Sequence, residues 1–163
     1  MNAAGSAMPD ISWRDVLSGK LTLFGHRNWV VIADAAYPAQ SAPGVTTIAA
    51  DDNHLDVVKI VLGQIESSSH VKARIHTDSE LEFVNERDAP GVEQFRARLA
   101  EMLHSEAMLH EEIIDRLAAA AAKFEVLVIK TKLTIPYTSV FLELDCGYWT
   151  ADAEARLRAT MDS

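Results

Sequence analysis

The sequence has 163 residues, a length that suits one folded domain. Hydrophobic residues make up 48% and charged residues 24%, a balance that favours a packed core over a disordered chain. The formal net charge of −9 argues against nucleic acid or an anionic membrane surface as the main partner, because both need clustered Lys and Arg. A single cysteine, Cys146, excludes an internal disulfide and a four-cysteine zinc site.

The two ends of the chain differ in character. Residues 1–10 are rich in Ala, Gly and Ser and predict a disordered tail, while we expect residues 11–163 to form a single domain. The tail has neither the basic segment nor the apolar core of a signal peptide, and no apolar run approaches the length of a membrane span. The sequence therefore predicts a cytoplasmic protein.

The first half of the chain alternates between helical and strand patterns. Residues 11–17 predict a short helix with Asp10 or Ser12 as its N-cap. The continuous apolar run 29–33 predicts a buried parallel strand, because a glycine-led loop precedes it and Pro38 follows. Weaker strand patterns cover 45–49, 71–75 and 80–84, and apolar residues at helical spacing predict a helix over 53–65.

The second half predicts one long helical region and two strands. An apolar stripe runs from 92 to 124, and a break or kink near 104–105 is expected because an unbroken helix would be unusually long. Apolar runs at 126–129 and 140–142 predict the last strands. This order predicts an α/β fold with helices on both faces of a layered sheet. Ligands in such folds bind beyond the carboxyl ends of strands, here after residue 33 and in the loop 131–139.

Polar side chains lie at both of these places. His26 precedes the 29–33 strand and Asp34 follows it, so the pair could line a cleft, or could be an exposed loop histidine and a turn-capping carboxylate. In the loop 131–139, Tyr137 follows Pro136. This tyrosine could stack on a sugar face, or could be an apolar plug beneath a hairpin.

Together these segments resemble the D-ribose pyranase / L-fucose mutarotase family. The early motif is Gly25-His26, an apolar strand, then Asp34-Ala35 and Tyr37-Pro38; in the late motif Tyr137 follows Thr131 by six residues. The resemblance implies a ribose pyranase / fucose mutarotase-like α/β fold and a monosaccharide substrate. It also implies catalytic roles for His26, Asp34 and Tyr137, and substrate contacts by His110, Thr131 and Ser139.

His110 enters this set through a His-Glu-Glu stretch that ribose pyranases carry before their last strand pair. Counting back from Tyr137 without a gap reaches Asp115 instead, so both positions stay open. The family also assembles into rings whose sites are completed by a neighbouring subunit, which implies a homo-oligomer with its sites near subunit interfaces.

The implied reaction opens a cyclic hemiacetal by moving one proton from the anomeric hydroxyl and another to the ring oxygen. This is general acid–base work that needs no cofactor and no metal. We expect His26 to exchange the proton, Asp34 to orient it or accept sugar hydroxyls, and Tyr137 to act as sugar platform or second proton donor.

Two departures from the family motif favour an alternative. Ser139 stands where the family has Asn, and Lys132 where it has Gly. These changes would suit a non-catalytic sugar- or metabolite-binding protein on the same scaffold. A third hypothesis is an assembly protein that uses the helical region 92–124.

Overall fold

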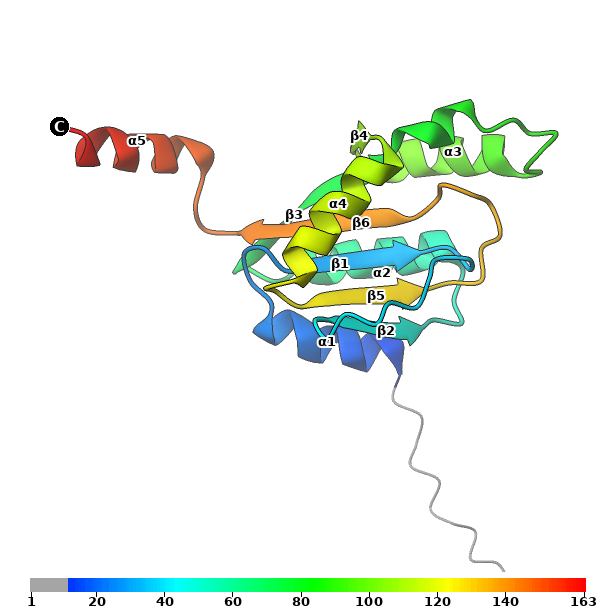
Figure 1. Cartoon of the computed structure of the whole chain (residues 1–163), viewed down its shortest axis with the longest axis horizontal. Coiled ribbons are helices and arrows are strands. Elements are labelled where there is room, and N and C mark those ends of the chain that lie inside the picture. The colour runs from blue at the N-terminus through cyan, green and yellow to red at the C-terminus, as the bar shows by residue number, and fades with distance from the viewer. Residues whose placement is uncertain (1–11) are drawn as a thin grey trace, which may run out of the picture.

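In the computed structural model, which describes residues 12–163, a six-stranded mixed sheet carries helices on both faces (Figure 1). The strands are β1 (Trp29–Ala33), β2 (Val45–Ala49), β3 (Val71–Asp78), β4 (Glu106–Met108), β5 (Val126–Lys130) and β6 (Val140–Cys146). The helices are α1 (Trp13–Leu23), α2 (His54–Glu66), α3 (Val92–Met102), α4 (His110–Ala121) and α5 (Ala151–Met161), and η1 (Ser79–Phe83) is a 3-10 helix. The predicted layered α/β class is confirmed.

The strand order β2-β5-β1-β6-β3-β4 brings several strand ends together. Strands β2, β5 and β1 run parallel, and β6 runs antiparallel between β1 and β3. In this register Val140, the first residue of β6, faces Ile32 near the end of β1 and Thr77 near the end of β3. One edge of the sheet therefore collects the carboxyl ends of β1, β3 and β5 and the amino end of β6.

Each face of the sheet has its own core. In Figure 1, α4 crosses one face and α2 lies behind the other. Successive side chains of β1 alternate between the two faces: Val30 and Ile32 pack on the α2 side, and Val31 packs with Phe141 under α4. All five residues of β1 are buried, as expected for a central strand covered on both faces. The predicted buried strand at 29–33 is thus confirmed.

Several element boundaries differ from the sequence predictions. The Ser12 side chain caps α1, which continues to Leu23; residues 1–10 and the other cap candidate, Asp10, lie outside the described residues. The strand predicted over 80–84 is wrong, because β3 extends to Asp78 and residues 79–83 then turn as η1, with Leu81 the buried residue of that turn.

The long helical stripe is divided in two. Helix α3 ends at Met102, and β4 pairs with the end of β3 before α4 begins at His110. The predicted break is present, but it contains a short strand rather than a kink. Helix α5, which the sequence did not predict, has no buried residue and projects away from the sheet (Figure 1). None of the helices between residues 12 and 163 is long and apolar enough to cross a membrane.

Candidate active site

The edge where β1, β3, β5 and β6 meet holds a cluster of polar and aromatic side chains. It consists of Asp34 after β1, Tyr37 in the following turn, Asp78 at the end of β3, His110 at the start of α4, and Tyr137 and Ser139 before β6. We call this set the edge cluster. It contains four of the six residues that the sequence singled out.

His110 is held from three directions. Its backbone N–H donates to both carboxylate oxygens of Glu80, at 3.0 and 3.1 Å, which caps the amino end of α4. Its ring Nδ1 lies 2.9 Å from Oδ1 of Asp78, and the ring edge contacts Tyr137 at a centroid distance of 5.7 Å and Phe141 at 6.4 Å. Because a carboxylate can only accept, Nδ1 carries the proton and Nε2 is left for acid–base chemistry.

Asp34 is joined to the amino end of β6 by a reciprocal pair of hydrogen bonds. Its backbone N–H donates to Oγ of Ser139 at 3.2 Å, and the Ser139 hydroxyl donates to Oδ1 of Asp34 at 2.9 Å. The carboxylate is half-buried, and it lines a pocket of about 320 Å³ together with Ile135 and Pro136. Asp34 is therefore both fixed and reachable.

Burial dominates the electrostatics of the edge cluster. It raises the pKa of Tyr37 to about 12, and the nearby carboxylates of Asp78 and Asp34 add to that rise. Burial also raises the pKa of Asp78, against the opposing effect of its bond to His110. Within residues 12–163, Oδ2 of Asp78 is buried without a hydrogen-bond partner.

His26 lies at the opposite end of β1. The five residues of that strand place the two ends roughly 16 Å apart, so one chain does not bring His26 to Asp34. Nδ1 of His26 is 3.1 Å from Oδ1 of Asp145, and Nε2 accepts from Arg27 at 3.1 Å. The histidine lines a groove of about 630 Å³ whose other cationic residues are Arg27, Arg74, Arg116 and Lys123.

Two further positions from the sequence prediction, Thr131 and Asp115, lie outside the edge cluster. Thr131 is only 4% exposed, and its hydroxyl oxygen lies 2.7 Å from His54 and 3.0 Å from the Ala33 carbonyl. It therefore supports the edge from inside rather than facing it. Asp115 is exposed on α4, whereas His110 lies in the edge cluster, so the geometry favours His110 of the two positions that the sequence left open.

Sequence reasoning missed Asp78 and gave Tyr37 no role. Asp78 directly ends β3 as Asp34 directly follows β1, so a strand extended from residue 75 to residue 78 would have revealed it. Nothing in the local pattern indicates that Glu80 caps α4, because thirty residues separate the two partners. Over residues 12–163, no group of three or more His, Cys, Asp or Glu side chains is arranged to hold a metal ion.

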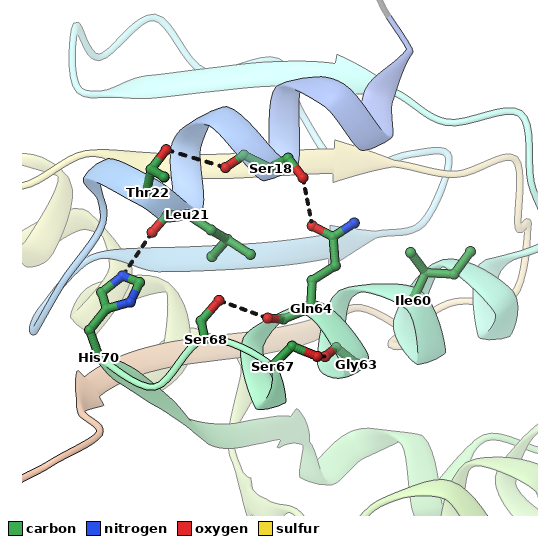
Figure 2. A pocket seen from close by; sticks show the side chains of 9 residues that line it. All are labelled: Ser18, Leu21, Thr22, Ile60, Gly63, Gln64, Ser67, Ser68 and His70. Atoms are coloured by element: carbon green, nitrogen blue, oxygen red, sulfur yellow. Dashed lines mark hydrogen bonds between the residues drawn. The ribbon is translucent and has the colours of Figure 1, made fainter.

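A second hollow, of about 410 Å³, lies between α1 and α2 (Figure 2). Its hydroxyls already donate to helix groups: Thr22 to the Gly19 carbonyl, Ser67 to the Gly63 carbonyl, and Ser68 to the Gln64 carbonyl. Nε2 of His70 lies 2.8 and 3.0 Å from the carbonyls of Leu21 and Phe24. These groups stabilise helix ends, so the edge cluster is the better candidate site.

Comparison with known proteins agrees with the observed fold. A model of the RbsD / FucU transport protein family matches residues 14–146, a range that ends before α5. Among proteins of curated function, none matches the chain. Two similar solved structures are RbsD of Bacillus subtilis complexed with D-ribose and the fucose mutarotase of Streptococcus pneumoniae in complex with L-fucose.

The first structure is 21% identical with a TM-score of 0.53, and the match covers 80% of this chain and 91% of that one. The second is 20% identical with a TM-score of 0.54, and the match covers 86% and 97%. At these identities, the two structures show only that this chain shares their fold. The family model covers most of the chain, and we conclude that the chain belongs to the RbsD / FucU transport protein family.

Proposed function

We propose that this protein binds a monosaccharide and interconverts its ring forms by general acid–base catalysis. The observation that carries the proposal is the His110–Asp78 pair, 2.9 Å apart, at the same sheet edge as Asp34. The two similar structures, one complexed with D-ribose and one with L-fucose, support a sugar of this size as the ligand.

The reaction needs one group that takes a proton and one that gives a proton. Nε2 of His110 takes the proton of the anomeric hydroxyl while a second acid protonates the ring oxygen, which breaks the bond between ring oxygen and anomeric carbon and leaves the open carbonyl form. Asp78 stabilises the imidazolium that forms, because its carboxylate accepts from Nδ1. Reversing both transfers after rotation about the carbon–carbon bond closes the new ring form.

Asp34 and Tyr137 position the sugar in this scheme. The half-buried carboxylate of Asp34 accepts from sugar hydroxyls, and its orientation is set by Ser139. Tyr137 is 40% exposed and its ring lies at 79° to the His110 ring, so the exposed part of the ring can pack on the apolar face of a sugar.

We propose further that His26 reaches the edge cluster from a second copy of the chain, as the second acid. The edge cluster contains two carboxylates, Asp34 and Asp78, whereas the groove around His26 carries four cationic side chains against two carboxylates, Glu143 and Asp145. Surfaces of opposite charge at the two ends of β1 favour a head-to-tail contact, and such contacts close into rings. The expected protein is therefore a homo-oligomer with its sites at the subunit interfaces.

Exchange spectroscopy by NMR tests the activity directly. D-ribose and L-fucose are each incubated with the protein, and the exchange rate between their ring forms is compared with the rate in buffer and with the His110→Asn variant. The proposal expects faster exchange with the wild-type protein and a rate near buffer with the variant. No acceleration for either sugar, or for related aldoses at high protein concentration, contradicts it.

The second candidate is a sugar-binding protein without catalysis. Its supporting observation is that the described chain holds one histidine in the edge cluster and keeps His26 apart from it. Thermal stabilisation by a sugar, together with an exchange rate equal to that in buffer, would favour this candidate over the enzyme.

A further inference from the structure

We propose that His54 is a positioning residue of the edge cluster: it fixes the loop 131–139 at both ends and so sets the orientation of Tyr137 and Ser139. This inference rests on the proposed function for its catalytic consequence only. At the sequence level, the stretch 51–54 that contains His54 is better interpreted as a helix cap than as a metal loop.

The contacts of His54 are short and lie on both sides of its ring. Nδ1 is 2.7 Å from Oγ1 of Thr131, and Nε2 is 2.8 Å from the carbonyl oxygen of Thr138. The ring also packs against Phe95 at a centroid distance of 5.7 Å. His54 is only 3% exposed, so solvent does not compete for either bond.

The two partners determine where the imidazole carries its proton. A carbonyl oxygen only accepts, so Nε2 donates to Thr138 and the neutral ring has an acceptor at Nδ1. The single Thr131 hydroxyl proton then goes to Nδ1, while the Ala33 carbonyl, 3.0 Å from the same oxygen, keeps the bond that the Thr131 backbone N–H donates to it. Burial lowers the pKa of His54 to about 4, which keeps this single arrangement at neutral pH.

These bonds hold the loop at its first residue and at the residue between Tyr137 and Ser139. Tyr137 has a φ of 59°, a left-handed conformation that is strained for a residue other than glycine. The turn that imposes it is closed by the bond from the Thr138 hydroxyl to the Ile135 carbonyl, 2.7 Å long. A clamp on Thr138 therefore keeps Tyr137 against His110 and Ser139 against Asp34.

The test measures the loop without any ligand and then the activity. The ring protons of His110 sense the Tyr137 ring at 5.7 Å, so their NMR shifts report whether the loop is in place. Tyr137→Leu gives the shifts expected when that ring is absent. His54→Leu removes both clamp bonds, whereas His54→Gln keeps one donor and one acceptor.

His70→Leu is the matched control, because His70 also bonds backbone carbonyls but lies in the hollow between α1 and α2 (Figure 2). We expect His54→Leu to move the His110 shifts toward those of Tyr137→Leu, and His54→Gln and His70→Leu to leave them near wild type. With a sugar that the wild type converts, we expect His54→Leu to slow exchange by about 10- to 100-fold and His54→Gln to restore most of the rate.

The outcomes separate this inference from the proposed function. If no sugar is converted by any variant, the proposed function fails, while the His110 shifts still decide the role of His54. Unchanged His110 shifts in a folded His54→Leu protein overturn the positioning role. If that variant does not fold, Thr131→Val removes one clamp bond without the larger substitution, and unchanged shifts there have the same meaning.

Discussion

The pH dependence of stability offers a quantitative test of the buried His54. Burial lowers the pKa of this imidazole from 6.5 to about 4 in the folded protein. Below pH 6.5 the unfolded chain therefore takes up a proton that the folded protein refuses, and the free energy of unfolding falls as the pH falls. The stabilisation is complete above pH 6.5 and is lost as the pH approaches 4.

The size of the effect follows from the two pKa values. At about 1.4 kcal/mol for each tenfold change in proton affinity, the full contribution is about 3 kcal/mol, and most of it is lost by pH 4.5. This is a large fraction of the stability of an ordinary domain. Because His54 is almost fully buried, solvent screening does not reduce the figure.

Urea unfolding at pH 7.5 and pH 4.5, at one fixed protein concentration, measures the loss. The wild-type protein is compared with His54→Gln, whose amide keeps a donor and an acceptor but does not titrate. Burial also lowers the pKa of His76, so the acid loss of the wild type alone is not diagnostic. We expect the wild type to lose roughly 2–3 kcal/mol more than the variant between the two pH values. Equal losses in both proteins would refute the reasoning.

Three further predictions concern the edge cluster, the core under α4 and the assembly. Asp78→Asn should raise the free energy of unfolding at neutral pH, because burial raises the pKa of Asp78 and so disfavours its charged form. It should also slow sugar exchange, because an amide cannot stabilise an imidazolium as a carboxylate does. Urea unfolding and exchange NMR measure the two effects, and a less stable variant contradicts the first. Phe141→Ala should lower the free energy of unfolding in urea by about 3–5 kcal/mol, because Phe141 is fully buried. Phe83 is 83% exposed, so Phe83→Ala should change it by less than about 0.5 kcal/mol. Similar losses in the two variants would mean that the core under α4 is not as described. His26→Ala and Asp34→Asn should each inactivate the protein. If each site takes these two residues from different copies, equal amounts of the two variants refolded together should regain about a quarter of the wild-type exchange rate. No regain would mean that both residues act in the site of one chain, or that neither acts in a site.

Local patterns were sufficient for most of the architecture. The apolar run at 29–33 predicts a strand covered on both faces, and that strand is the centre of the sheet. The 80–84 segment was misjudged because a short alternation of apolar residues does not distinguish a strand from a turn with one buried residue, here Leu81. Helix α5 was missed because its residues form no apolar stripe against the sheet.

Local sequence patterns indicate the order of the elements, the family motif and four of the six residues of the edge cluster. Which side chains meet was decided only by the tertiary structure, because strand order carries no local signature. Asp78 and His110, 32 residues apart, become partners because β6 lies between β1 and β3 and α4 begins at the same edge. His26 and Asp34 are close in sequence, but an extended strand holds its two ends apart, so within one chain they stay at opposite edges.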